Sequence, residues 1–292
     1  MNSVKLTLMF IVFNIVILFF LIALGFFSFH TLGFDFAGTF WRSSWPIILG
    51  MLAVLGALDI YWAMNRRLLV LLQQEDWPAL THYLETRIIQ EGHYSSRLIR
   101  LLAQTYLAHS NSAALIDLEH HIIEKKPRLL ETHALVLGLA RLLHKDISGG
   151  VQFFSARLNV LRAKSARQEF ARGDPSWIHW YYGFTLLLEQ QFPLSAEQLM
   201  CLARKSHEAL VAGLAAFYLT DTLCKVLPEQ STELYAAALE GRRRVRKSLH
   251  TLGAWDKAVL KIQAEIYGII MLQALQNAGH WIYEEQAPQE KS

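Results

Sequence analysis

The hydrophobic pattern opens with two long apolar stretches near the N-terminus. Residues 6–29 contain no Asp, Glu, Lys or Arg, and residues 46–64 contain one charged side chain, Asp59. A helix as long as the first stretch rises about 36 Å, which is enough to cross a bilayer. Aromatic side chains near the ends of the second, such as Trp62, suit a membrane interface. The pattern predicts a two-helix transmembrane anchor over residues 1–67, with spans at about 6–29 and 46–64.

Beyond the second stretch, apolar positions recur with the 3.6-residue period of amphipathic helices. Trp77, Leu80, Leu84 and Ile88 form one apolar stripe, and Asp76 is placed to cap the helix that carries it. No segment shows a convincing strand alternation. The chain is therefore predicted to be all-α.

Glycine, asparagine and proline positions divide the rest of the chain into short helices that follow one another in pairs. The fragments LIRLLAQTY and LVLGLARLL lie 37 positions apart and match in their apolar positions, including Ala103 with Ala140. An offset of this size is typical of helical repeats. The predicted repeat domain covers residues 68–279 and leaves a polar tail at 280–292. Its expected helices lie at about 77–91, 94–109, 115–125, 127–141, 150–171, 176–191, 195–205, 207–226, 229–250 and 254–278.

The first helix pairs carry large and small residues at a known spacing. Trp77, Leu80 and Leu84 fit the first helix of a tetratricopeptide unit, and Ala103 and Ala140 fit its small second-helix positions. In these residues the domain resembles tetratricopeptide repeats. Two spans followed directly by such repeats are also similar in architecture to HemY-type membrane proteins. The resemblance implies a tetratricopeptide-like α-solenoid of stacked helix pairs, whose groove binds a protein or peptide partner.

Charges beside the apolar stretches predict the orientation of the anchor. Lys5 precedes the first stretch and Arg66 and Arg67 follow the second, whereas the loop between them holds Asp35 against Arg42. The positive-inside rule then places both termini, and with them the repeat domain, in the cytoplasm, and makes the loop external. A cleaved signal peptide is the competing interpretation of the first stretch, although no small-residue cleavage site follows it.

The composition of the chain is consistent with a folded protein in the cytoplasm and identifies no activity. The chain is 53% hydrophobic with a mean hydropathy of +0.22, which excludes a disordered protein. A net charge of +3, without a recognisable nucleic-acid-binding motif, argues against a nucleic-acid partner. Cys201 and Cys224 are far apart in sequence and suit a reducing compartment. An integral membrane protein with two spans and a cytoplasmic domain is expected.

Asp59 raises a specific question, because a carboxylate inside a membrane is costly and often functional. Asn14 lies at a similar depth on the first span, so an antiparallel hairpin would let the two side chains form a hydrogen bond. Gly50, Ala53 and Ala57 are expected to face the first span and permit close approach. The alternative is a proton or ion role for Asp59.

An aromatic run, WIHWYYGF, begins at Trp177 and supplies the candidate partner-binding residues. Tryptophan and tyrosine offer large, rigid contact surfaces with polar tips. The alternative is an aromatic core between two helices, because three of these side chains share one helical face. The candidates for partner binding are Trp177, Trp180, Tyr181 and Tyr182.

The run RRRVRK is the strongest charge feature of the chain and lies in the later half of a predicted helix. Cations are favourable near a helix C-terminus, so a solvated face is one interpretation. Contact with anionic lipid is the second, and an acidic partner or RNA is the third. The candidates for an anionic-surface contact are Arg242, Arg243, Arg244, Arg246 and Lys247.

Motifs of catalysis are absent from the sequence: it holds no G-x-S-x-G, phosphate loop, G-x-G-x-x-G or H-E-x-x-H. His120 and His121 are adjacent and point about 100° apart on a helix, so they do not make a metal pair. Catalytic residues, cofactors and metals are therefore not predicted. We expect a membrane-anchored protein–protein interaction scaffold or assembly factor. The alternative is a subunit of a membrane enzyme or ion-handling complex that uses Asp59.

Overall fold

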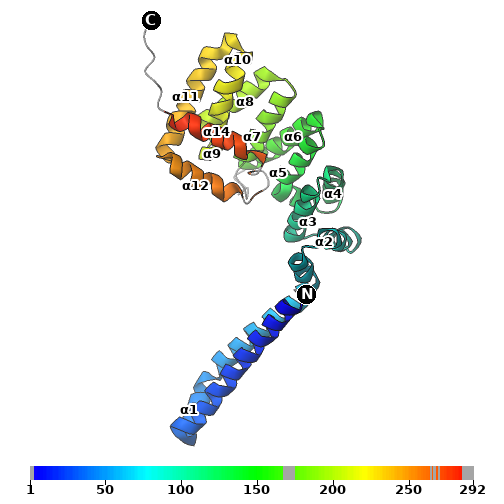
Figure 1. Ribbon diagram of the computed structural model, residues 1–292, viewed down its shortest axis with the longest axis vertical. Coiled ribbons are helices and arrows are strands. Elements are labelled where there is room, and N and C mark those ends of the chain that lie inside the picture. The colour runs from blue at the N-terminus through cyan, green and yellow to red at the C-terminus, as the bar shows by residue number, and fades with distance from the viewer. Residues whose placement is uncertain (1–2, 167–174, 264, 266–267, 269, 285–292) are drawn as a thin grey trace. The chain divides into compact units, whose positions relative to one another are not determined.

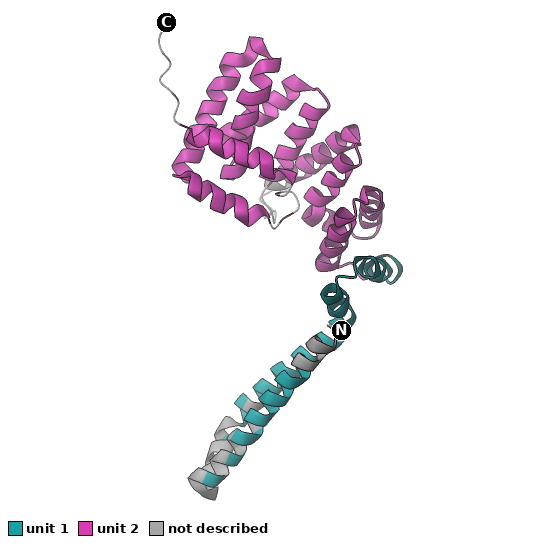
Figure 2. Ribbon diagram, in the orientation of Figure 1, with its two compact units in different colours: residues 1–92 teal, residues 93–292 magenta. Residues whose placement is uncertain are grey.

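The computed structural model describes residues 3–166, 175–263, 265, 268 and 270–284. Within these residues every regular element is a helix, and no strand occurs (Figure 1). The prediction of an all-α chain is confirmed. The chain divides into two compact units, Met1–Gly92 and His93–Ser292, which Figure 2 colours separately.

The first unit is built on α1 (Ser3–Gln74), which folds back on itself as two arms (Figure 1). A straight helix would separate Asn14 from Asp59 by about 67 Å. Instead, Asn14 Nδ2 donates a hydrogen bond to Asp59 Oδ1 at 2.9 Å. Phe10 and Trp62 stack beside this bond, with ring centroids 4.5 Å apart. Helical structure continues through the segment predicted as a loop, so the reversal needs no long irregular connection.

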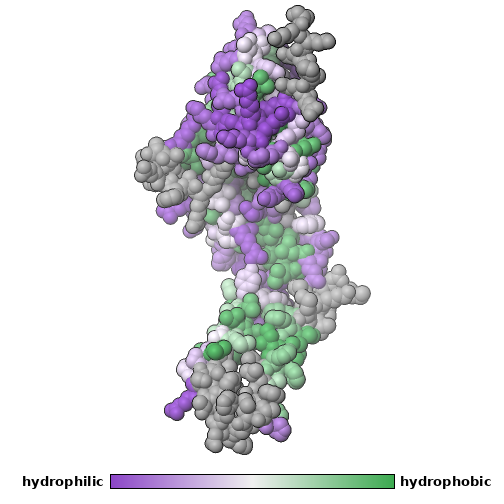
Figure 3. All heavy atoms as spheres, turned by 90° about the vertical axis from the view of Figure 1, so that its left-hand side faces the viewer, coloured by the Kyte–Doolittle hydropathy of each residue, from purple (hydrophilic) through white to green (hydrophobic). Residues whose placement is uncertain are grey.

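Apolar side chains cover the outside of these arms. The second arm, Trp45–Gln74, has a hydropathy of 2.0, and none of its most apolar window is buried. Phe20 on the first arm and Met64 on the second are each 69% exposed. In Figure 3 the coloured part of this surface, above the grey residues, is largely green, the colour of apolar residues. By length and hydropathy, this arm is able to cross a membrane.

On the first arm, the apolar helical stretch in the described part is Phe10–Phe20. Other side chains of the predicted span, residues 6–29, lie outside the described part. The side chains of Lys5 and Asp35 also lie outside it. The structure therefore gives the course of the first arm and not the charge pattern from which orientation was predicted.

The small-residue face predicted for the second arm points outward, so its expected role in helix approach is wrong. Gly50, Ala53 and Ala57 are exposed, and a Cβ added to Gly50 would meet nothing within 4 Å. The seam between the arms is instead lined by Asp59 and Trp62. Their contacts with the first arm set the helix rotation, because they bury larger surfaces than glycine or alanine would.

A short turn joins α1 to the first amphipathic helix, α2 (Trp77–Glu85). Glu75 adopts a left-handed conformation with φ of 54°, and Asp76 follows as the helix cap. One carboxylate oxygen of Asp76 accepts a hydrogen bond from the Ala79 N–H at 3.1 Å. The helix of the second arm thus runs to within three residues of α2.

Contacts with α1 hold α2 in the first unit, and the π-helical turn η1 (Thr86–Gln90) packs on α2. Leu80 and Leu84 of the predicted stripe are fully buried, and the guanidinium of Arg67 lies 5.3 Å from the ring centre of Tyr83. The predicted domain boundary at residue 67 therefore separates segments that pack together. The structure divides the chain after Gly92.

The second unit consists of short helices that pack mainly on their sequence neighbours (Figure 1). Each of α5, α6, α7 and α8 contacts the helix before it and the helix after it, and α11 covers α8 and α9. The elements are α3 (Ser96–Ala108), α4 (Ser112–Lys125), α5 (Pro127–Leu143), α6 (Ile147–Ala166), α7 (Ser176–Leu188), α8 (Phe192–Lys205), α9 (Ala209–Tyr218), η2 (Leu219–Leu223), α10 (Cys224–Val226), η3 (Pro228–Gln230), α11 (Ser231–Ser248), α12 (Leu252–Gln263) and α14 (Leu272–Tyr283).

Glycines allow two of the closest crossings in this unit. A Cβ on Gly138 of α5 would lie 2.4 Å from the ring of Phe154 on α6. A Cβ on Gly241 of α11 would lie 3.1 Å from the Cβ atoms of Ala203 and Ala216. Gly138 leaves room for the Phe154 ring, and Gly241 lets α11 lie close to Ala203 and Ala216, which is how small residues tighten helix packing.

The C-terminal part differs from its prediction. Residues 254–278 were expected to form one helix, but α12 ends at Gln263 and α14 begins at Leu272. The break lets α14 pack against α12, so that the Trp255 indole N–H donates to the Leu275 carbonyl at 3.0 Å. A single straight helix could not make this contact, because its two residues are 20 positions apart.

A second stretch, Ala209–Val226, is also long and apolar enough to cross a membrane. Half of it is buried inside the second unit, where Val211, Leu214 and Leu219 belong to the core. Its hydropathy is therefore explained by packing within the protein.

One turn geometry recurs along the chain. Its left-handed residues, Glu75, Ser110, Lys145 and Gln190, are the non-glycine residues with positive φ in the described part. In each case the N–H of the left-handed residue donates to the carbonyl of the residue three positions before it. The N–H of the following residue donates to the carbonyl five positions before itself. That pattern is a Schellman helix end. The helices that follow the four turns begin at Trp77, Ser112, Ile147 and Phe192, so the first three starts are spaced by 35 residues.

His133 links α5 to α3 and makes stability dependent on pH. Its Nε2 lies 3.1 Å from Ser96 Oγ, and burial, reinforced by Arg100, lowers the pKa of His133. Below about pH 6.5 His133 takes up a proton more readily in the unfolded chain than in the folded chain. The free energy of unfolding therefore decreases as the pH is lowered. We expect His133→Gln to lose less stability than the wild type between about pH 7 and pH 5. Urea titrations at both pH values test this, and equal losses in the two proteins would contradict it.

Candidate functional site

The predicted polar pair lies in the seam of α1. Asn14 and Asp59 meet at 2.9 Å, and Arg66 lies 5.5 Å from the ring centre of Trp62, one turn further along. Within the described residues, the side-chain oxygen of Asn14 and the indole N–H of Trp62 have no hydrogen-bond partner. The seam therefore holds polar groups among apolar surfaces. Its chemistry is hydrogen bonding between the arms.

The aromatic run is interior, so its assignment as a partner-binding surface is wrong for three of four residues. Trp177 is 5% exposed, and Trp180 and Tyr181 are fully buried. Tyr181 stacks on Phe154 of α6 at 5.7 Å between ring centroids. The cause is burial of α7 between α6 and α8. Tyr182 is half-buried and remains the accessible member.

The basic run on α11 holds the C-terminal ends of other helices. Arg242 and Arg246 each donate to the carbonyls of Ile282 and Glu284, which end α14. Arg242 is 6% exposed, and burial together with repulsion from Arg246 lowers its pKa. The cation of each guanidinium also complements the negative end of the α14 dipole.

Arg244 does the same for a different helix. It donates to the carbonyls of Ala203 at 3.2 Å and Ser206 at 2.9 Å, at the end of α8. Arg242, Arg244 and Arg246 therefore cap helix ends. The anionic-surface prediction is wrong for the buried Arg242, whereas it stays a prediction for the half-buried Arg244 and the exposed Arg246. Arg243 and Lys247 are exposed and lie four positions apart on the outer face of α11.

Paired substitutions on α11 separate the two classes of arginine. We expect Arg244→Met to lower the free energy of unfolding by about 1–2 kcal/mol, because two charge-assisted bonds to α8 are lost. Arg243→Met should change it by less than about 0.5 kcal/mol, since that side chain is exposed. Denaturant unfolding of the full chain in neutral detergent measures both. Equal losses would show that the capping bonds contribute nothing.

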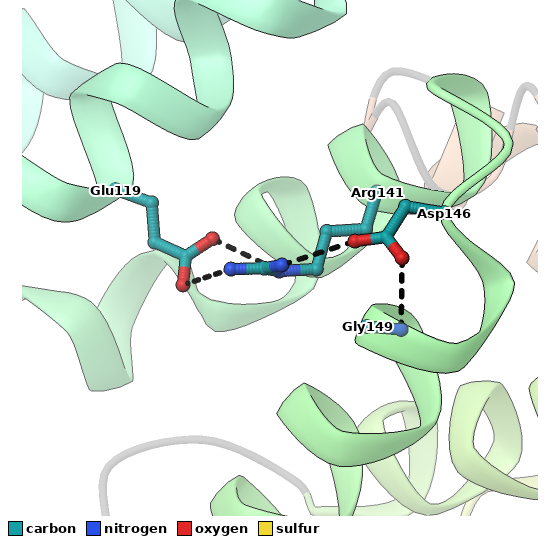
Figure 4. Close-up of polar contacts among 4 residues, drawn as sticks. All are labelled: Glu119, Arg141, Asp146 and Gly149. Atoms are coloured by element: carbon teal, nitrogen blue, oxygen red, sulfur yellow. Dashed lines mark hydrogen bonds and ion pairs between the residues drawn. The ribbon is translucent and has the colours of Figure 1, made fainter.

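A partly buried polar network that the sequence did not reveal joins α4, α5 and the start of α6 (Figure 4). Arg141 donates two bonds to Glu119, at 3.0 and 3.2 Å, and one to Asp146 at 3.2 Å. The other oxygen of Asp146 accepts the Gly149 N–H at 3.0 Å and caps α6. The bonds to Glu119 and Asp146 raise the pKa of Arg141 despite the opposing effect of burial. This arrangement fixes the three helices relative to one another, and both of its carboxylates are held by hydrogen bonds.

Metal and thiol chemistry find little support in the described residues. No group of three or more His, Cys, Asp or Glu side chains there is arranged to hold a metal ion. Cys201 and Cys224 are both free and half-buried, and burial raises the pKa of the Cys224 thiol. A raised pKa reduces the thiolate fraction on which nucleophilic reactivity depends.

Comparison with known proteins gives one family and one relative. A family described as "Uncharacterised Treponema protein" has a model that matches residues 114–284. An "Uncharacterized protein" of Treponema pallidum (strain Nichols) is 25% identical over 255 residues, covering 84% of this chain and 78% of the relative. No solved structure matches. Because residues after α1 make up about three quarters of the chain, the match to the relative extends into α1.

Proposed function

The chain belongs to this family of uncharacterised Treponema proteins, and we propose that it acts as a membrane-anchored interaction scaffold or assembly factor. In this proposal α1 is a two-span transmembrane hairpin. The second unit, which contains all of the family-matched residues, is a tetratricopeptide-like solenoid that binds a protein or peptide partner. No catalytic step is assigned to it.

The observation that carries the proposal is the exposed apolar surface of α1. The most apolar stretch of the second arm contains no buried residue. Such an exposed apolar helix would aggregate in water, whereas in a bilayer its exposure is favourable. The seam supports this, because the Asn14–Asp59 bond gives each polar side chain a partner away from lipid. The proposal therefore assigns Asp59 to pairing of the arms.

The repeated turns support the solenoid. Helix starts spaced by 35 residues, each after the same left-handed turn, are close to the period of about 34 residues in tetratricopeptide arrays. Consecutive helices of the second unit also pack on one another, which is how repeat proteins build a continuous core. Arrays of this kind bind segments of other proteins along an extended face.

The proposed orientation is cytoplasmic for the second unit, from the flanking charges of the spans. Reporter fusions after Ser292 test it directly. Activity of a reporter that works only outside the cytoplasm would reverse the orientation and leave the anchor itself in place.

Proximity labelling tests the scaffold. A labelling enzyme is fused after Ser292 of the full chain and, as the control, after Gln74 of α1 alone. We expect the full chain to label a reproducible set of proteins that α1 alone does not label. Identical sets from both fusions, at equal expression in the same membrane, would contradict a binding role for the second unit.

A further inference from the structure

A cavity of about 360 Å³ opens between α6, α7 and the end of α8. Its apolar wall includes Leu158 and Leu161 of α6 and Leu202 of α8. Its polar groups come from three separate segments, namely Arg162, Ser176, His179, Lys205, Ser206 and His207. The volume is within the range of about 300–1,000 Å³ that small-molecule sites occupy.

The charge of this lining has one sign. Arg162 on α6 and Lys205 on α8 are cationic, and His179 and His207 add two imidazoles. Among the described residues that line the cavity, none is Asp or Glu. The described side chains that line the cavity therefore offer donors and positive charge to a ligand.

Helix ends reinforce this potential. The N-terminus of α7 lies at the cavity through Ser176, so the positive end of its dipole faces the same space. The C-terminus of α8 would oppose it, but Arg244 caps the carbonyls of Ala203 and Ser206 there. Arg162 also acts on His179 electrostatically. Burial lowers the pKa of His179 and Arg162 lowers it further, against the hydrogen bond of 2.9 Å that His179 Nε2 donates to Gln198 Oε1.

We propose that this cavity binds a small organic anion, with a phosphate or carboxylate group between Arg162 and Lys205 and an apolar body against the leucine wall. Guanidinium and ammonium groups recognise such anions by charge-assisted hydrogen bonds. Ser176 and Ser206 also line the cavity, and their hydroxyl oxygens lie 3.1 Å apart. This site is independent of the interaction role proposed for the domain.

Two cysteines of the chain provide a footprint. Cys201 lines the cavity, whereas Cys224 lies elsewhere and donates to the Ser231 carbonyl. The full chain in neutral detergent is labelled with a maleimide in the presence of phenyl phosphate, an anion with an apolar ring. We expect phenyl phosphate to slow labelling of Cys201 saturably and to leave the rate at Cys224 unchanged. Phenol, which lacks the anion, should protect neither.

Substitutions then locate the anion. Arg162→Gln with Lys205→Gln should weaken protection of Cys201 by about tenfold or more, since charge-assisted bonds are lost. Arg243→Gln with Lys247→Gln removes the same charge from α11 and should have no effect. All four side chains are exposed in part or whole, so both variants are expected to fold. Unchanged Cys201 labelling in phenyl phosphate, or equal protection in both variants, would overturn the site.

A final comparison identifies the source of the anion. The full chain is placed in phosphatidylcholine nanodiscs with or without phosphatidic acid and labelled without phenyl phosphate. Equal Cys201 rates in the two membranes support a soluble ligand. Protection of Cys201 by phosphatidic acid, lost in the Arg162→Gln and Lys205→Gln variant, supports the same site with a lipid headgroup as its ligand.

Discussion

Replacing Arg141 by methionine is expected to lower the free energy of unfolding by about 3–5 kcal/mol. The side chain of Glu119 is 3% exposed, and in the wild type it receives two hydrogen bonds from Arg141. Methionine keeps the aliphatic volume but leaves a buried carboxylate without its cation. The same change removes the bond that steadies Asp146 at the start of α6. Chemical unfolding of the full chain in detergent, followed by circular dichroism, measures the loss.

The matched control removes both charges. Glu119→Leu combined with Arg141→Met should recover much of the lost stability, because apolar replacement of a buried pair is often neutral. If Arg141→Met alone is within about 1 kcal/mol of the wild type, the network does not hold α4 to α5.

Trp255→Ala is expected to cost about 3–5 kcal/mol, the range for truncating a large buried aromatic side chain. The indole is fully buried, and its N–H bonds to the Leu275 carbonyl. Two glycines leave room for the indole. A Cβ added at Gly213 would lie 2.5 Å from the indole ring, and a Cβ added at Gly279 would lie 2.6 Å from it. The ring thus fastens α12 to α9 and α14. Leu260→Ala on the same helix, where the side chain is 64% exposed, should change stability by less than about 0.5 kcal/mol.

Coupling between ring and glycine tests this geometry separately from the truncation. Gly213→Ala should cost about 1–3 kcal/mol in the wild type because it overpacks the ring. In a Trp255→Leu background the same substitution should cost less, since the two nearest clashing atoms are gone and only Ile282 Cδ1, at 2.8 Å, remains among the three nearest. Additive losses in the double variant would contradict the packing described here.

The periodic part of the fold was predictable from the sequence. Leu80, Leu84 and Ile88 were placed on one helical face and all three are fully buried. Such stripes depend on local spacing, which a sequence displays directly. Trp77 was assigned to the same face but is 40% exposed, because it lies in the first turn of α2.

Features that depend on tertiary contacts were not predictable in the same way. The partners of Arg242, Arg244 and Arg246 are backbone carbonyls 36 to 42 positions away. A run of cations shows no sign of such partners, so a surface role was among its interpretations. Likewise, the Glu119–Arg141 pair spans 22 positions and matches no motif.

The recurring turn was hidden for a different reason. Left-handed positions are usually marked by glycine, whereas here they are occupied by Glu75, Ser110, Lys145 and Gln190. What the sequence does contain is a capping residue directly after three of them, at Asp76, Asn111 and Asp146. Aligning the chain on these caps gives a repeat spacing of 35 residues. Matching the apolar fragments had given a spacing of 37 residues.

Extraction of membranes with alkaline carbonate tests the central claim, that α1 inserts the protein into a bilayer. The full chain and a version beginning at Glu75 are expressed with the same C-terminal tag, and membranes are washed and sedimented. We expect the full chain to stay in the membrane pellet, because the apolar surface that both arms expose would be buried in lipid. The shorter version should appear in the supernatant. Release of the full chain by carbonate, in folded and unaggregated form, would contradict the transmembrane hairpin.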